Sequence, residues 1–144
     1  MFGIRVRGAV SARKQEGAMM ILEATTEQII GCAYRVYNTM GFGFLEAVYE
    51  KCMTIELAKT GLLFESQKPI TVRYEGQIVG KFIADFHVEG PIIVELKSTR
   101  TIVQAHEIQL VNYLVATGVD VGLLINFAEH KVEVKRKTRR LPAG

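Results

Sequence analysis

The chain of 144 residues has few cysteines and no hydrophobic run long enough to cross a membrane. A membrane-spanning helix needs roughly 20 consecutive apolar residues, whereas the longest candidate, Val119 to Phe127, is interrupted by Asp120 and Gly122. The two cysteines, Cys32 and Cys52, lie among apolar residues and form no Cys-x-x-Cys pair. This favours two reduced, buried thiols over a disulfide or a metal site. We therefore expect a soluble protein of the cytoplasm.

The sequence also lacks internal repeats, low-complexity segments and any linker long enough to divide the chain. With 49% apolar and 23% charged residues it can bury a core, which excludes a disordered or collagen-like chain. Its length is typical of one domain. We expect that domain over residues 20–137, a basic arm or leader over residues 1–19 and a basic tail over residues 138–144. Met19 or Met20 could equally be the first residue of the protein.

Positive charge is concentrated at the two ends of the chain, although the net charge is only +3. Residues 131–144 carry six Lys or Arg against one acidic residue, and residues 1–17 carry four against one. Residues 18–130 carry eight against 13, so the body is acidic. This distribution excludes a uniformly cationic binder of the histone type.

Two hydrophobic periods alternate along the chain. A period of 3.6 residues predicts helices over about 25–40, 44–60 and 102–117. A period of two predicts strands over 70–74, 78–88, 92–96, 121–127 and 131–137. The predicted order is α-α-β-β-β-α-β-β, which is an α/β domain.

The first two predicted helices have recognisable boundaries. Thr25 or Thr26, with Glu27 close behind, is typical of an N-terminal helix cap. Gly61 is well placed to end the second helix. The apolar residues that we expect to face inward on the second helix are Leu45, Val48, Cys52, Ile55, Leu57 and Ala58.

Two acids and a lysine are predicted to converge on neighbouring strands. Side chains alternate along a strand, so Asp85 faces Glu95 at about 5 Å if the two strands pair, and Lys97 lies roughly 7 Å further along the same face. Two buried carboxylates are tolerable only if solvent or a cation compensates their charge. Mg²⁺ suits this arrangement, because it takes carboxylate oxygens, water, substrate phosphate and a backbone carbonyl such as that of Leu96. The Lys97 ammonium could orient or deprotonate the attacking water, or stabilise charge on phosphorus.

Taken alone, the Glu-x-Lys motif is weak, and its simpler interpretation is a surface ion pair on an exposed strand. The flanking helices favour a functional site. Glu46 and Tyr49 lie three apart on the second predicted helix, directly after a Gly-rich bend, and Gln109 and Tyr113 lie four apart on the third. Each pair therefore shares one face of an otherwise apolar helix.

These residues carry a resemblance to a known family. The segment at 43–49, Gly-Phe-Leu-Glu-Ala-Val-Tyr, resembles the signature of the GxxExxY protein family. Asp85, the Glu-x-Lys motif at 95–97 and the Gln-x-x-x-Tyr motif at 109–113 resemble motifs of RecB-like nucleases in the PD-(D/E)XK superfamily. The resemblance covers about residues 20–137.

The resemblance implies a restriction-endonuclease-like core, with a central mixed sheet flanked by helices, and Mg²⁺- or Mn²⁺-dependent hydrolysis of phosphodiester bonds. The sequence departs from the superfamily pattern at Ala84, where Pro is common. The implied roles are metal ligand for Asp85 and Glu95, catalytic base or electrostatic stabiliser for Lys97, additional acid of the metal shell for Glu46, and positioning of the substrate or of the Glu-x-Lys strand for Gln109 and Tyr113.

We expect the substrate to be nucleic acid, with DNA favoured, and the basic tail to collect it. Duplex DNA presents one charge per about 1.7 Å of its axis, which a run of cations can match. The alternative is a solvated, solubilising end to an edge strand. The tail residues in question are Lys135, Arg136, Lys137, Arg139 and Arg140.

Two histidines are further candidates for the same site. His87 is two residues after Asp85, and His106 is three residues before Gln109. Either could be a neighbour of the metal, although a lone histidine on a strand is more often structural or solvated.

Two other functions remain open from the sequence. A nuclease-like fold could retain its acids for structure and act as an inactive module that binds nucleic acid or protein. A homo-oligomeric structural protein is a third class, because the last strand has an open edge and the apolar content could serve a homodimer interface.

Overall fold

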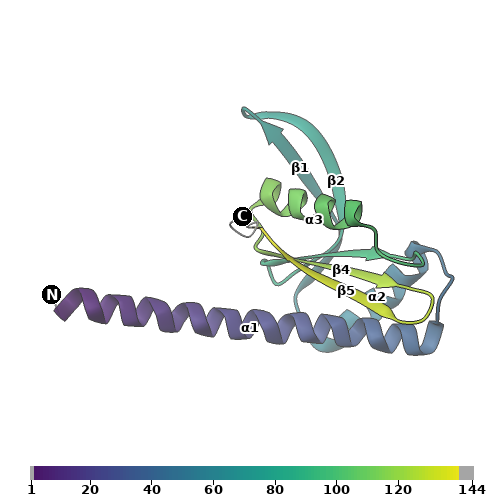
Figure 1. Cartoon of the computed structure of the whole chain (residues 1–144), viewed down its shortest axis with the longest axis horizontal. Coiled ribbons are helices and arrows are strands. Elements are labelled where there is room, and N and C mark those ends of the chain that lie inside the picture. Colours follow the sequence, from purple (N-terminus) through teal and green to yellow (C-terminus); the bar gives the residue numbers. More distant parts are fainter. Residues whose placement is uncertain (1, 140–144) are drawn as a thin grey trace.

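The computed structural model describes residues 2–139, with side chains described from residue 12 onward, and its elements follow the predicted order α-α-β-β-β-α-β-β (Figure 1). The prediction of an α/β domain is therefore confirmed. Arg140, the last of the predicted tail cations, lies outside the described residues. The elements are α1 (Phe2–Met40), α2 (Glu46–Thr60), β1 (Phe64–Tyr74), β2 (Gln77–Val88), β3 (Ile92–Lys97), α3 (Gln104–Thr117), β4 (Val121–Phe127) and β5 (Val132–Thr138).

The five strands form one mixed sheet in the order β1-β2-β3-β4-β5, in which only β3 and β4 are parallel. Helix α3 connects these two strands, as parallel neighbours require a crossover. Helices α1 and α2 lie on one side of the sheet and α3 lies on the other (Figure 1). None of the described helices is both long and apolar enough to cross a membrane.

Each side of the sheet has its own hydrophobic core. The large core lies between the sheet and the α1–α2 pair and includes Ile29, Tyr49, Phe86 and Phe127. The small core lies under α3 and consists of Ile70, Ala84, Ile93, Leu110, Leu114 and Leu124. All seven residues of β4 are buried, as expected for a strand that is covered on both sides, whereas burial alternates along the second half of β2.

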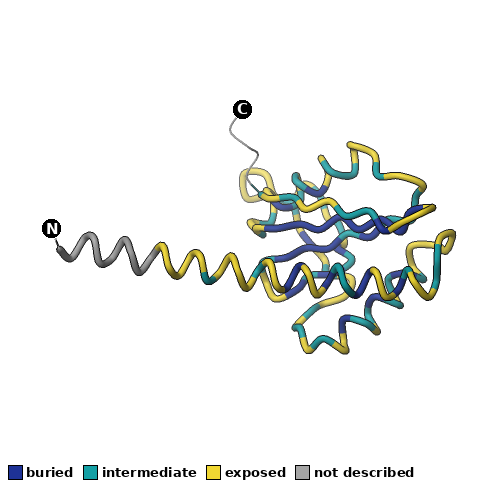
Figure 2. Tube along the Cα trace, turned by 60° about the horizontal axis from the view of Figure 1, so that its bottom comes forward, coloured by how far each residue is buried: buried dark blue, intermediate teal, exposed yellow. Residues whose placement is uncertain are grey.

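Helix α1 begins far earlier than the predicted cap. It starts at Phe2, and its first half extends away from the rest of the molecule (Figure 1), while Figure 2 shows its second half lying against the sheet. Thr25 and Thr26 are buried inside the helix, where their hydroxyls donate to the carbonyls of Ile21 and Glu23 at 2.9 and 2.8 Å. A threonine that bonds back to the preceding turn satisfies its hydroxyl without ending the helix, so the predicted start was wrong.

The buried face of α2 also differs from the prediction. Leu45 and Ile55 are 79% and 60% exposed, whereas Tyr49, Met53 and Leu57 are buried. The Tyr49 ring stacks on Phe127 with 4.2 Å between ring centroids. Leu57 is thus buried as predicted, but the rest of the predicted face was misplaced because it treated Tyr49 as a polar position, although an aromatic ring contributes a large apolar area when it is buried.

Strand β2 passes from one core to the other along its length. Phe86 and Val88 belong to the large core, whereas Ala84 belongs to the small core and Phe82 packs against it. Pairing between β2 and β3 runs only from Val88 to Phe86, while β1 and β2 stay paired along almost their whole length. The β1–β2 ribbon therefore leaves the main sheet and rises past α3 (Figure 1). Asp85 lies at the point where β2 separates from β3.

Helix α3 packs very closely on β4 at Gly122. A Cβ atom at this position would lie 2.8 to 2.9 Å from three side-chain carbons of Leu110. Those contacts are shorter than van der Waals separation, so glycine sets the height of α3 above the sheet.

We expect Gly122→Ala to lower the free energy of unfolding by about 1 to 3 kcal/mol, because α3 must move to relieve the overlap. Gly31→Ala is the matched control, since its Cβ would meet only Arg35 Nη1 at 3.5 Å and the site is helical. That control should gain about 0.5 to 1 kcal/mol from higher helix propensity. Urea unfolding of both variants measures the difference, and equal effects would show that Gly122 does not limit the packing.

Candidate active site

The side chain of Asp85 bonds to the backbone of β3. Its Oδ2 accepts the Leu96 N–H at 2.7 Å. Extending the β2–β3 register by one residue beyond Phe86↔Val94 places Asp85 opposite Glu95. The N–H and C=O of one strand residue point to the same side, so the Leu96 carbonyl faces the side on which Asp85 lies. The two acids thus lie opposite each other directly beyond the last residue pair of the β2–β3 ladder.

Both carboxyl groups are difficult to ionise in this position. Burial, together with the charge of Asp85, raises the pKa of Glu95 to about 8. Burial also raises the pKa of Asp85 to about 6, although the Leu96 N–H bond opposes this shift. Glu95 Oε1 is buried and has no hydrogen-bond partner. A buried acceptor without a donor is costly, so this oxygen is available to a ligand.

Lys97 lies next to the acid pair but is not bound to it. Its ammonium makes no hydrogen bond or ion pair with any described residue, while its positive charge lowers the pKa of both Asp85 and Glu95. In the parallel β3–β4 register Lys97 is opposite Asn126. The side chain is half-buried, so its charge acts on the acids from the edge of the site.

The buried Asn126 fixes the segment that follows Lys97. Its Oδ1 accepts the Thr99 N–H at 2.9 Å, and its Nδ2 donates to the Thr99 carbonyl and to Glu133 Oε1, both at 2.9 Å. Ser98 donates its hydroxyl to the Phe44 carbonyl at 2.6 Å. The end of β3 is therefore tied both to β4 and to the bend before α2.

That bend places Glu46 in the first turn of α2, beside the end of β3. Tyr49, which was predicted to share the site face with Glu46, is buried instead; its hydroxyl donates to the Gly41 carbonyl and accepts the Phe44 N–H at 3.4 Å. Glu46 is exposed, and its charge raises the pKa of both Asp85 and Glu95. Tyr49 thus holds the bend, while Glu46 acts on the acid pair at longer range.

Sequence reasoning did not identify Glu50, one turn after Glu46. Its charge raises the pKa of Asp85 more than that of Glu46 does. Its two carboxylate oxygens accept bonds from Ser66 Oγ at 3.2 Å and Gln67 Nε2 at 2.7 Å. Gln67 has a φ of 55°, which is unusual within a strand. The only available signal was the spacing of four residues between the two glutamates, which places them on one helix face.

Helix α3 forms one wall of the site with the two predicted residues. Gln109 Nε2 donates to the Tyr113 hydroxyl at 2.7 Å, and the Tyr113 ring stacks on Phe82 with 3.4 Å between centroids. Burial raises the pKa of Tyr113, and the charge of Glu95 adds to this. The charge of the acid pair thus acts on Tyr113.

The two histidine candidates differ in their surroundings. A ring nitrogen of His87, Nε2, lies 2.6 Å from the Gly90 carbonyl in the β2–β3 turn, which fits a structural role. His106 Nδ1 is buried without a partner. His106 lies one and two turns before Leu110 and Tyr113, so it is on the side of α3 that faces the sheet.

Two of the predicted tail cations are already paired with acids of the body. Lys137 Nζ lies 2.6 Å from Glu107 Oε1, and Arg139 Nη2 lies 3.0 Å from Asp120 Oδ1. Lys135 and Arg136 are exposed. Strand β5 runs away from the acid pair, since Lys137 is opposite Gly122 whereas Lys97 is opposite Asn126, four residues further along β4.

The donor set of the acid pair fits a hard divalent cation. It offers carboxylate oxygens from Asp85 and Glu95, one of them without a partner, and the carbonyl of Leu96, all of which suit Mg²⁺ or Mn²⁺. Among the described residues, no three His, Cys, Asp or Glu side chains are gathered closely enough to hold a metal. The remaining coordination positions would therefore be filled by water or substrate, as is usual for Mg²⁺.

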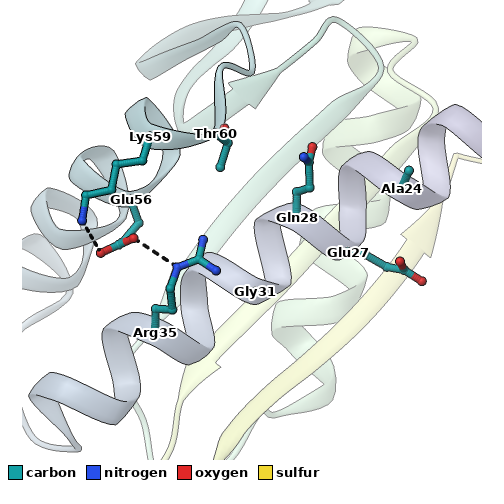
Figure 3. A pocket seen from close by; sticks show the side chains of 8 residues that line it. All are labelled: Ala24, Glu27, Gln28, Gly31, Arg35, Glu56, Lys59 and Thr60. Carbon is teal, nitrogen blue, oxygen red and sulfur yellow. Dashed lines mark hydrogen bonds and ion pairs between the residues drawn. The ribbon is translucent and has the colours of Figure 1, made fainter.

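A large surface hollow, about 790 Å³ in volume, lies elsewhere, between α1 and α2 (Figure 3). Glu56 crosses it and pairs with Arg35 at 3.2 Å and with Lys59 at 3.1 Å. The charge of Glu56 is thus balanced within the hollow, and none of the acid-pair residues lines it. Cys32 is buried, as predicted, whereas Cys52 is half-buried.

Comparisons with known proteins agree with this arrangement. The sequence model of the PD-(D/E)XK nuclease superfamily matches residues 23–138, and the chain belongs to this superfamily. The five-stranded mixed sheet flanked by helices is the restriction-endonuclease-like fold that the resemblance implied.

One similar solved structure is the "Crystal structure of SSO0001", with a TM-score of 0.54 and 18% sequence identity over 67% of this chain. At this identity the likeness concerns the fold alone. The chain spans about half the length of that protein, 51%. Comparison with curated proteins gives no significant match.

The raised pKa values predict how stability depends on pH. The folded state holds the Glu95 proton up to about pH 8, whereas the ordinary pKa is 4.5. Between these values the folded protein holds a proton at Glu95 that the unfolded chain has lost, so the stability that this group contributes is fully present below pH 4.5 and is lost as the pH rises towards 8. The slope for one proton is about 1.4 kcal/mol per pH unit.

We expect Glu95→Gln to remove most of this fall in urea unfolding measured across the same pH range without metal. The control is Glu65→Gln, because Glu65 is exposed and the Lys68 ion pair lowers its pKa. A wild-type slope that persists in Glu95→Gln would contradict the assignment of the buried proton to this site.

Proposed function

We propose that this protein is a metal-dependent nuclease that hydrolyses phosphodiester bonds in DNA. The observation that carries the proposal is the half-buried pair of Asp85 and Glu95, with a buried, unpartnered oxygen on Glu95 and Lys97 two residues further along the strand. Membership in the PD-(D/E)XK nuclease superfamily supports the same conclusion. The alternative is an inactive module of the same fold that binds nucleic acid or protein.

The metal would be Mg²⁺ or Mn²⁺, held by Asp85, Glu95 and the Leu96 carbonyl. When bound, such an ion polarises a phosphoryl oxygen and lowers the pKa of a bound water. It would also stabilise the charged form of both carboxylates, whose ionisation burial otherwise opposes. Glu46 would add negative charge from the first turn of α2.

The other residues have roles that follow from their positions. The Lys97 ammonium is free to hold an attacking water or to stabilise negative charge on the phosphate, since no described residue binds it. Gln109 orients the Tyr113 hydroxyl, and the Phe82 ring fixes the plane of Tyr113. This pair would position the substrate against the acid pair.

We further propose that the chain belongs to the GxxExxY family within this superfamily. The hydrogen bonds of Tyr49 support this, because they give a physical reason for that tyrosine three residues after Glu46. The tyrosine holds the Gly41–Phe44 bend, and the glutamate follows where the bend enters α2. A homodimer stays a prediction.

We expect the purified protein to cleave DNA with Mg²⁺ or Mn²⁺ and to lose this activity with EDTA. Lys97→Ala should lower the cleavage rate by a factor of about 10² to 10⁴, which is the usual contribution of one general acid or base to the rate. Asp85→Asn and Glu95→Gln should lose cleavage as well. Gel-based cleavage assays with Lys51→Ala, which removes an exposed cation of α2, provide the control.

Metal binding separates the nuclease from the inactive module. In calorimetry with Mn²⁺, Lys97→Ala should bind as the wild type does, whereas Glu95→Gln should bind more weakly. If Mn²⁺ binding depends on both acids but the wild type cleaves no nucleic acid, the binding module is the better description. Cleavage that survives in both Glu95→Ala and Lys97→Ala would overturn the site.

A further inference from the structure

Two loops lie together at the end of the sheet where β3 ends, at Lys97. One is residues 98–103, between β3 and α3, and the other is residues 128–131, between β4 and β5. We call these two loops the rim. Because β3 and β4 are parallel, both loops leave the sheet at the same end.

The first loop of the rim is held firmly although it has no regular structure. Asn126 binds both the N–H and the C=O of Thr99 at 2.9 Å. The Thr99 hydroxyl donates to the Thr101 carbonyl at 2.8 Å, and the Ser98 hydroxyl donates to Phe44. The hydroxyls of Ser98 and Thr99 are thus used within the protein, while the residue between Thr99 and Thr101 projects from a fixed backbone.

That residue is Arg100, whose guanidinium has unused donors. Its side chain is 84% exposed, and it makes no hydrogen bond with any described residue. Its one ion pair, with Glu129 Oε2, is 3.9 Å long, beyond hydrogen-bonding distance. An exposed pair of this length contributes little to stability, so the fold gives no structural reason for an arginine here.

The facing loop contributes one more cation, Lys131, together with the acid Glu129. Lys131 is exposed, and its carbonyl accepts the Ala128 N–H, which closes the loop into a tight turn. The Tyr37 hydroxyl of α1 binds the Ala128 carbonyl at 2.6 Å and fixes that turn to the body. Both loops therefore present their cations from an anchored backbone. Arg100 follows Lys97 by three residues.

We propose that the rim binds the phosphate backbone of the nucleic acid next to the acid pair, with Arg100 as its principal contact. The proposal rests on the nuclease function and adds the surface on which the substrate lies. A guanidinium presents five N–H donors in a planar fork that matches phosphate oxygens. Contacts of this kind recognise the charge and spacing of the phosphates and do not depend on the base sequence.

The rim suits this role better than the basic tail does. Lys137 and Arg139 are paired with Glu107 and Asp120, so contact with phosphate would require those pairs to break. The described tail also lies towards the opposite end of β4 from Asn126. Arg100 has to release only the long contact with Glu129.

The test is DNA binding by fluorescence anisotropy with a short duplex, in Ca²⁺ instead of Mg²⁺, over a series of salt concentrations. Arg100→Ala should weaken binding about tenfold, the value of one lost hydrogen bond to a charged group. It should also reduce the slope of log affinity against log salt by about 0.9, because one phosphate contact is lost. Arg100→Lys should recover part of the affinity and all of the slope.

Lys59→Ala is the matched control. Lys59 is likewise an exposed cation with one acidic partner, and it lies about 20 Å along α2 from Glu46. Lys59→Ala removes the same net charge as Arg100→Ala does. Because Lys59 lies far from the rim, its loss should leave the slope of log affinity against log salt unchanged. The double variant Lys135→Ala/Arg136→Ala tests the tail in the same way.

The outcomes separate the rim from the nuclease function. If Arg100→Ala binds like the wild type while the tail variant loses affinity and slope, the rim proposal is overturned and the tail is the contact surface. If the wild type cleaves DNA and Arg100→Ala keeps the wild-type slope, the rim is again overturned but the function stands. If the wild type neither binds nor cleaves nucleic acid, both proposals fail.

Discussion

The hydrogen bond from the Leu96 N–H to the Asp85 carboxylate determines the rest of the site. Pairing between β2 and β3 stops at Phe86↔Val94, so the backbone of β2 is no longer available to satisfy the next amide of β3. The Asp85 side chain replaces that backbone acceptor at 2.7 Å. The substitution fixes the carboxylate opposite Glu95, in a place that is too buried for either acid to ionise easily. A cation is the natural partner for such a pair.

Neutral hydrogen bonds, not ion pairs, hold the charged groups of this site in place. Asn126 ties the segment after Lys97 to β4, Ser98 ties it to Phe44, and Tyr49 closes the bend from which α2 begins. None of these contacts depends on pH in the neutral range, whereas the acids themselves titrate there. The framework can therefore stay unchanged while the protons or a cation on the acid pair are exchanged.

The sequence allowed the element order and the convergence of Asp85 and Glu95 to be predicted, because hydrophobic periods and side-chain alternation are local properties. It could not show that β2 crosses between two cores, since alternation does not reveal a twist. Thr25 was misread because its hydroxyl bonds back within α1 as readily as it caps a helix. Glu50 and Asn126 were missed because their partners, Gln67 and Thr99, lie 17 and 27 residues away.

The division of the interior into a large and a small core has a dynamic consequence. The acid pair lies between them, with α1, α2 and the main sheet on one side and α3 with the β1–β2 ribbon on the other. Local opening of a folded protein costs least where the fewest apolar contacts must be broken. The wall formed by α3, which carries Gln109 and Tyr113, is therefore the side of the site that opens locally at the lowest free-energy cost, while the large core remains intact.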